Sequence, residues 1–207
     1  MPERVVYNAH ARTDGLSESE SEGELVSEPV RIEQYESAGA LQLKEPILAV
    51  YLASHHDQQH NPWFGPGPFW QRLVELYAPS RDFGLVVAWR GDTMVGYAFG
   101  SPKDDAADVW QMVERTLPEV AVPKTPEPIY FFREFAVDPA HQGKGYGRLI
   151  HDALLKARPE RLAHLLVRQD NPAKNAYLHW SWHIVGQVQP FSDAPVMDAM
   201  VKILSVE

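Results

Sequence analysis

A run of alternating glycines is the part of this 207-residue chain whose residue types and spacing best suit chemistry. Gly143, Gly145 and Gly147 occupy every second position, and the apolar pattern of a helix follows directly. A glycine-rich turn before a helix leaves backbone N–H groups unpaired at the positive end of the helix dipole. Such a turn can hold the phosphate of a cofactor. The alternative is a tight turn that needs glycine dihedrals and nothing more.

Two other nucleotide-binding motifs fail at named positions. The dinucleotide fingerprint requires glycine at 148, where this chain has Arg148, and too few residues follow to complete a doubly wound sheet. A phosphate-binding P-loop requires Ser or Thr after its lysine, but Lys144 is followed by Gly145. Neither motif therefore describes the turn.

Alternating and helical hydrophobic patterns predict the elements that position this turn. We expect strands at 30–35, 83–89, 93–99, 129–137, 162–167, 182–188 and 196–204. We expect helices near 46–52, 68–79, 106–117, 145–157 and 172–180. This order indicates an α/β fold, with a mixed sheet and helices on its faces.

Composition bounds the domain organisation. Residues 1–27 are rich in Ser and Glu and are predicted to be a disordered acidic tail, because they cannot bury enough apolar surface to offset the entropy of ordering. Residues 28–207 form one predicted domain, with an excursion from the core at about 101–128, where four prolines follow a helix. Much of the net charge of −9 lies in the tail, so the domain gives no sign of a nucleic-acid surface.

The chain has no cysteine, which excludes disulfides, thiolate metal sites and a cysteine nucleophile. No apolar run approaches the ~20 residues that span a bilayer, and the first residues lack the apolar stretch of a secretory signal. We therefore expect a cytoplasmic protein without a membrane partner.

The glycine turn resembles the central signature of the GNAT superfamily of N-acetyltransferases: Gln or Arg, any two residues, Gly, any one residue, then Gly or Ala. Gln142, Gly145 and Gly147 match it in full. The strand end Phe135-Ala136-Val137-Asp138-Pro139 and the segment from Asn171 to Tyr177 are also similar to the family. The resemblance covers about 129–188 and implies a mixed, mostly antiparallel central sheet flanked by helices.

The resemblance implies acetyl-CoA as acetyl donor and gives each matching residue a role. The backbone of Phe135, Ala136 and Val137 would pair with the pantetheine arm, Asn171 would be a second cofactor contact, and Tyr177 would protonate the departing thiolate. The pyrophosphate would be held by backbone amides of Gln142, Gly143, Lys144, Gly145, Tyr146, Gly147 and Arg148. The side chains of Lys144 and Arg148 either add charge-assisted contacts or are simply solvated.

Direct acetyl transfer needs a base for the amine proton, and Glu134 is the candidate because it lies in the apolar strand 129–137, where burial would raise its pKa. Strict alternation puts Glu134 on the opposite face from Phe131, the position where several family members carry a strand glutamate. A bulge near the strand end would change this parity. The alternative is a structural ion pair with Arg133 or Arg168.

The loop between the first two helices carries His55, His56 and His60, which are either proton shuttles or surface bystanders. No acidic cluster accompanies them, so no metal is expected. In the same region Trp63 and Phe64, flanked by Pro and Gly, are candidates for a pocket wall. Phe69, Trp70, Trp180 and Trp182 are assigned to packing.

The resemblance implies an N-acetyltransferase, and we expect its acceptor to be a primary amine of a small molecule. Two alternatives stay open. One is acetylation of the N-terminus or a lysine of a peptide or protein, and the other is a non-catalytic acyl-CoA-binding module. For the oligomeric state, a homodimer is left open.

Overall fold

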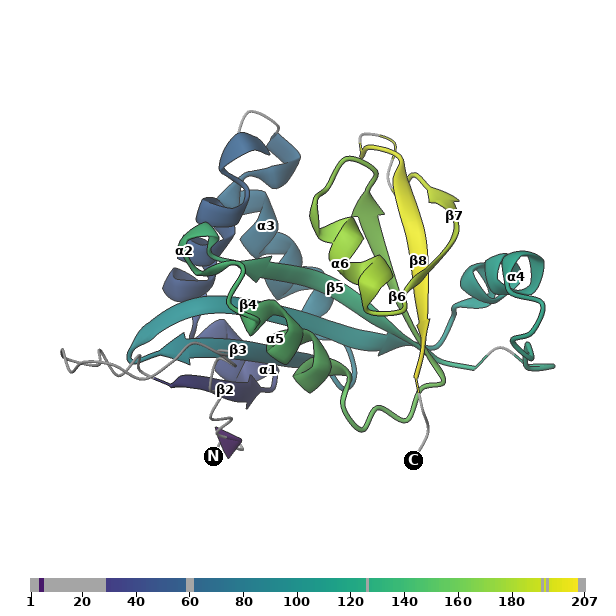
Figure 1. The fold of residues 1–207 in the computed structure, drawn as a ribbon, viewed down its shortest axis with the longest axis horizontal. Helices are drawn as coiled ribbons and strands as arrows, with labels where there is room; N and C mark the ends of the chain where they lie inside the picture. Colours follow the sequence, from purple (N-terminus) through teal and green to yellow (C-terminus); the bar gives the residue numbers. More distant parts are fainter. Residues whose placement is uncertain are drawn as a thin grey trace, which may run out of the picture.

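The computed structural model describes residues 4–5, 29–58, 62–125, 127–190, 192 and 194–204. The strands of these residues form one sheet in the order β1-β2-β3-β4-β5-β6-β8-β7 (Figure 1). The strands are β1 (Arg4–Val5), β2 (Val30–Tyr35), β3 (Gly84–Arg90), β4 (Thr93–Lys103), β5 (Ile129–Val137), β6 (Leu162–Arg168), β7 (His183–Val188) and β8 (Met197–Ile203). Neighbouring strands are antiparallel except β5 and β6, which are parallel. The predicted fold class is confirmed.

Helices cover both faces of the sheet (Figure 1). The α-helices are α1 (Ser37–Leu41), α2 (Lys44–Ser54), α3 (Pro66–Arg72), α4 (Ala107–Thr116), α5 (Tyr146–Leu155) and α6 (Ala173–His179). The 3₁₀ turns are η1 (His56–Gln58), η2 (Pro62–Phe64) and η4 (Pro139–His141), and α3 continues as the π-helical segment η3 (Leu73–Tyr77). One core cluster joins α5 and α6 to one face, and a second joins α1 to α3 to the other.

The segment 101–128, predicted as an excursion, contributes residues to β4 and, through α4, to a core cluster. Residues 101–103 complete β4, which runs further than the predicted 93–99. On α4, Val109, Trp110 and Val113 are buried in a third cluster with residues of β5, β6, β7 and β8. The apolar side of α4 covers the sheet here, and the loop between α4 and β5 carries the prolines.

A β-bulge in β5 reverses the alternation of its side chains. Glu134 pairs with Phe99 and Phe132 pairs with Gly100, so Arg133 is the extra residue. Phe132 and Phe135 consequently both pack toward α5 and α6. Glu134 shares the opposite face with Phe131, which corrects the strict alternation expected from the sequence.

β5 and β6 separate after a short parallel contact. Tyr130 pairs with Ala163 and Phe131 with His164, and beyond them β6 continues beside β8 while β5 diverges (Figure 1). From Phe132 to Val137, β5 has no partner strand on this side among the described residues. The end of β5 therefore presents a free edge.

Most of the predicted tail lies outside the described residues, so its disorder stays a prediction. The exception is the short strand β1, in which Arg4 pairs with Glu33 and Val5 with Ile32 of β2. No described helix is long and apolar enough to cross a lipid bilayer.

The bulge depends on a glycine, and we expect Gly100→Ala to destabilise the fold. An added methyl group would press against the Phe131 carbonyl oxygen and the Tyr130 ring. Overpacking of this kind costs about 1–3 kcal/mol, or several degrees of melting temperature for a domain of this size. Gly67→Ala is the control, because its methyl group would meet no atom within 4 Å. Equal melting temperatures of the two variants in calorimetry would contradict the prediction.

Candidate active site

The glycine turn between β5 and α5 has a backbone that other residues adopt only with strain. Gly143 has a φ of 74° and Gly145 a φ of 81°, both in the left-handed region. A Cβ atom at either position would meet no atom within 4 Å. Glycine is therefore needed at these positions for the positive φ angles and not for lack of space. The outer side of the turn stays open.

This turn exposes a set of unpaired backbone donors. Within the described part of the chain, no backbone acceptor is bound by the N–H groups of Gly143, Lys144, Gly145, Tyr146 and Gly147. The ten-residue helix α5 starts here without a side-chain cap and without an acidic residue in its first turn. The donors and the helix dipole together form a site for an anion such as a pyrophosphate.

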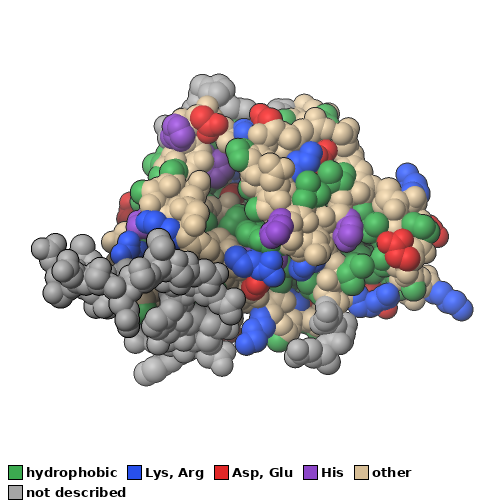
Figure 2. Space-filling model, in the orientation of Figure 1, with side chains coloured by type: hydrophobic (Ala, Val, Ile, Leu, Met, Phe, Trp, Pro, Cys, Tyr) green, Lys and Arg blue, Asp and Glu red, His purple; other side chains and the backbone are tan. Residues whose placement is uncertain are grey.

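Local hydrogen bonds hold the turn in place. The Gln142 Nε2 donates to the Val137 carbonyl at 3.1 Å, and the Lys144 Nζ donates to the Ala140 carbonyl at 3.1 Å. The Arg148 Nε pairs with Asp152 at 2.5 Å. Lys144 and Arg148 are therefore engaged locally, although their charges stay beside the turn. Lys and Arg side chains gather over α5 on the face drawn in Figure 2.

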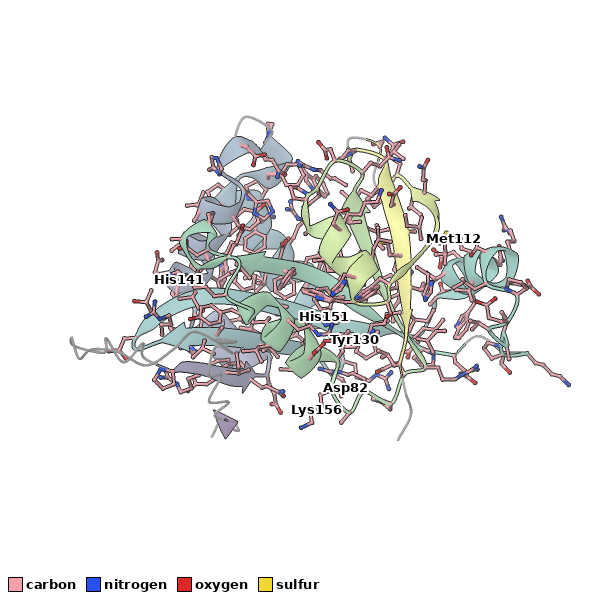
Figure 3. The ribbon with its side chains drawn as sticks, in the orientation of Figure 1. Asp82, Met112, Tyr130, His141, His151 and Lys156 are labelled. Atoms are coloured by element: carbon pink, nitrogen blue, oxygen red, sulfur yellow. The ribbon has the colours of Figure 1, made fainter. Side chains whose placement is uncertain are left out.

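A hydrogen bond of the buried His151 connects α5 to the segment after α6. His151 projects from α5 into the interior (Figure 3), where its Nε2 accepts a hydrogen bond from the Trp182 Nε1 at 2.9 Å. Its Nδ1 lies 2.7 Å from Asp152. Burial lowers the pKa of His151, which favours the neutral ring that this arrangement requires. Trp182 is buried and Trp180 packs against the same core, as predicted for both.

Tyr177 lies on α6 among aromatic rings close to the free edge of β5. Phe132, Phe135, Trp180 and Trp182 have ring centroids about 6 Å from its own. Burial raises the pKa of Tyr177 well above its ordinary value, and the Glu134 carboxylate raises it further. The phenol therefore keeps its proton at neutral pH. Its hydroxyl group has no hydrogen-bond partner among the described residues.

Asn171 contributes first to the position of α6. Its Oδ1 accepts from the Ala173 N–H at 2.9 Å, and its own N–H donates to the Arg168 carbonyl at 3.1 Å. The first bond satisfies the N–H of the first residue of α6, and the second closes the turn before this helix. The Nδ2 donates to no described residue, so it is free for a cofactor contact.

Glu134 is half-buried on the face covered by α2 and α3, and burial raises its pKa. His55, the Phe135 N–H and Arg72 act in the opposite direction. The Phe135 N–H donates to its Oε1 at 3.2 Å. In the described structure, neither Arg133 nor Arg168 forms an ion pair with Glu134, and Arg168 pairs with Asp170 at 3.1 Å. The ion-pair alternative finds no support.

Sequence reasoning missed several side chains around Glu134. Burial raises the pKa of Tyr51, Tyr77 and Tyr97, and Glu134 adds to the rise in each case. Arg72 acts on Tyr51 and Tyr77 in the lowering direction. These residues come from α2, α3, η3 and β4, so no local sequence pattern relates them. Only the folded sheet brings them to one place.

The loop after α2 adds aromatic walls to this region. His55 stacks on Tyr51 at 4.3 Å and faces Phe64 at 6.1 Å. Trp63 and Phe64 are half-buried, and the Trp63 carbonyl accepts from Arg72 at 3.0 Å. Figure 2 shows hydrophobic side chains in the hollow between the α2 and α6 regions.

Three further predictions for this region can be compared with the structure. His56 is exposed, whereas His60 lies outside the described residues. Phe69 is buried in the core, as predicted. No group of three or more His, Asp or Glu in the described part of the chain could hold a metal ion.

The site therefore has two sides that meet at the free edge of β5. The anion-binding turn and Tyr177 belong to the α5 and α6 side. Glu134 and its ring of tyrosines belong to the α2 and α3 side. A linear ligand along the edge would lie between the Glu134 side and the Tyr177 side.

Comparisons with known proteins agree with this geometry. The model of the acetyltransferase (GNAT) family matches residues 50–179. No curated protein sequence matches the chain.

Solved structures share the fold at low sequence identity. PH1933 from Pyrococcus horikoshii has a TM-score of 0.60 and 20% identity, over 85% of this chain and 99% of that one. The ribosomal-protein-S18-alanine N-acetyltransferase from Escherichia coli has a TM-score of 0.55 and 16% identity, over 85% and 94%. The PaiA N-acetyltransferase from Thermoplasma acidophilum, solved with coenzyme A, has a TM-score of 0.51 and 10% identity, over 84% and 98%.

The open glycine turn leads to a prediction for Gly145. We expect Gly145→Asp to lose CoA binding, because its carboxylate would repel the phosphates and compete for the free N–H groups. Gly145→Asn is the matched control, since Asn has nearly the same size and tolerates a positive φ but carries no charge. Titration calorimetry with CoA should give a Kd at least about 10-fold weaker for Asp than for Asn. Equal affinities in two folded variants would place the phosphates elsewhere.

Proposed function

Because the chain belongs to the GNAT acetyltransferase family, we propose that it transfers the acetyl group of acetyl-CoA to a primary amine of a small molecule. The observation that carries this proposal is the free edge of β5, with Glu134 and Tyr177 on its two sides and the open glycine turn at its end. The edge, the turn and the two proton-carrying groups are what direct acetyl transfer requires.

The residues of the turn and strand fit the cofactor. Its pyrophosphate would be held by the free N–H groups from Gly143 to Gly147, at the start of α5. The extended pantetheine arm would pair with the backbone of Phe135, Ala136 and Val137, where β5 is no longer paired with β6. The Asn171 amide would be a second contact. When bound, acetyl-CoA supplies the thioester that acylates the amine and releases the CoA thiolate.

Two side chains would move the protons. Glu134 accepts one from the amine, directly or through a water molecule, and Tyr177 donates its proton to the sulfur. The raised pKa of Glu134 makes it a stronger base than an ordinary carboxylate. The raised pKa of Tyr177 keeps its proton in place until a thiolate forms.

The aromatic walls on the α2 and α3 side favour a small acceptor. Trp63 and Phe64 of η2 and the stacked pair Tyr51 and His55 would form the walls of a pocket for the acceptor beside Glu134. A peptide or protein acceptor would need an open groove in the same place. A non-catalytic acyl-CoA-binding module would bind CoA without turnover. Cytoplasmic location and a homodimer stay predictions from the sequence.

A panel of amines tests the proposal directly. The protein is mixed with acetyl-CoA and each small amine, peptide or protein acceptor, and free CoA is measured against an amine-free blank. Release above the blank with a small amine supports the proposal. Release with peptides alone favours a macromolecular acceptor, and tight CoA binding without any release favours the binding module.

We expect Tyr177→Phe to slow the chemical step while the fold and CoA affinity survive. General acid catalysis contributes about 100-fold to 10,000-fold, so single-turnover acetylation should fall by at least about 100-fold. Tyr130→Phe is the matched control, because the Tyr130 hydroxyl is buried on β5 without a described partner. Acetylation by Tyr177→Phe within about threefold of wild type would make Tyr177 a packing residue.

We expect the pH profile of kcat/KM to show the raised pKa of Glu134. A base works deprotonated, so the rate rises with pH through its pKa, and burial moves this acidic limb above the ordinary value of 4.5. Glu134→Gln should remove the limb and lower kcat/KM by about 100-fold or more. The exposed Glu114→Gln on α4 is the control. Since deprotonation of the amine affects all three proteins equally, an unchanged profile in Glu134→Gln would exclude this base.

A further inference from the structure

Arg133 is the bulged residue of β5, and its positive charge lacks a carboxylate partner. Its guanidinium carbon lies 4.4 Å from the Phe131 ring centroid and 5.5 Å from that of Tyr77. Its Nε is buried and has no hydrogen-bond acceptor. No described Asp or Glu lies within ion-pair distance of it. Burial lowers the pKa of Arg133, and Tyr77 is the neighbour that opposes this change.

A cation in this position is costly unless something compensates for it. Arg133 is half-buried as a whole, but its buried Nε has lost its hydration without gaining an acceptor. The two aromatic rings occupy the neighbourhood of the guanidinium, which leaves its N–H edge as the unused group. The partner that best matches this edge is a carboxylate or a phosphate.

The surroundings of Arg133 add positive charge. The Lys103 Nζ lies 5.4 Å from the same Phe131 ring and forms no ion pair with a described residue. His164, buried beneath, has its pKa lowered to about 4 by burial and by both cations. The opposing carboxylate is Asp108, exposed at the start of α4. This area of an acidic protein is locally cationic.

Arg133 shares its neighbours with the candidate base. Tyr77 lies beside Arg133, and its phenol also responds to Arg72 and Glu134. Arg133 and Glu134 are consecutive residues of the bulge, which turns both toward the side of α2, α3 and η3. Phe131 and His164 form the last pair before β5 and β6 separate. Tyr77 is thus a shared neighbour of the Arg133 guanidinium and the Glu134 carboxylate.

We propose that the acceptor is an amine that carries a carboxylate, and that Arg133 binds this carboxylate while Glu134 receives the amine. This inference rests on the proposed acetyltransferase function and names the class of its substrate. A planar carboxylate matches the N–H fork of arginine through two parallel hydrogen bonds. Lys103 adds attraction at longer range. An amine without an anionic group would leave Arg133 as it is in the structure.

Matched pairs of acceptors test the inference on the wild-type protein. Glycine, β-alanine, 4-aminobutyrate, 5-aminovalerate and phenylalanine are each compared with their carboxamides, which keep the amine and remove the charge. We expect kcat/KM to favour the carboxylate by about 10-fold to 100-fold for the amino acids of matching length. Equal or higher values for every carboxamide overturn the inference and leave the acetyltransferase function standing.

Substitution of Arg133 shows whether this residue is the cause. Arg133→Met should bring the carboxylate-to-carboxamide ratio close to one, while Arg133→Lys should keep an intermediate ratio because it retains the charge without the fork. Arg115→Met removes an exposed arginine of α4 and should leave the ratio unchanged. A full preference in a folded Arg133→Met protein overturns the assignment.

Binding provides a readout that does not require turnover. Calorimetric titration of the CoA-bound protein with the preferred carboxylate, or with 4-aminobutyrate if no amine is acetylated, should give a Kd that rises at least about 10-fold in Arg133→Met. No CoA release with any amine would overturn the acetyltransferase function, whereas loss of this binding difference would overturn the role of Arg133.

Discussion

The separation of β5 from β6 is the constraint on which the site depends. Backbone N–H and C=O groups must be hydrogen-bonded or hydrated, and a strand inside a sheet normally meets this need on both edges. Here β5 does so on the β4 side throughout but on the β6 side only near Tyr130 and Phe131. The remaining edge is a template for an extended ligand. The glycine turn follows the end of this edge after η4, so an extended molecule along β5 would point its end toward the turn.

The bulge at Arg133 is the second constraint, and it decides what each side of the edge contains. Without it, Glu134 would point toward α5 and Phe135 toward α2. With the bulge, Phe132 and Phe135 pack against Tyr177. Arg133 and Glu134 lie on the other face, beside its tyrosines. One extra residue in one strand thereby separates the proton donor side from the proton acceptor side.

The parts predicted from the sequence are those encoded locally. The bounds of β5 follow from a largely apolar run that only Arg133 and Glu134 interrupt, and the glycine turn follows from spacing within six residues. The face of Glu134 could not be predicted, because the bulge forms where Gly100 of another strand fits closely against Tyr130 and Phe131. The sequence also did not predict the π-helical segment at the end of α3. Its hydrogen bond from the Ala78 N–H to the Leu73 carbonyl spans five residues, and no residue type in this stretch signals it.

Burial acts on Glu134 and Tyr177 in the same direction, but the two groups need opposite results. A general acid profits from burial alone, since burial keeps its proton in place. A general base must lose its proton, so burial helps only as long as nearby positive charge limits the rise of its pKa. His55, the Phe135 N–H and Arg72, in this order, limit the rise. The Arg72 guanidinium is held by a hydrogen bond to the Trp63 carbonyl and lies 4.4 Å from the Trp63 ring centroid. The region that carries His55 and Trp63 therefore contributes to the proton affinity of Glu134, and a change there would shift the pKa of this carboxyl group.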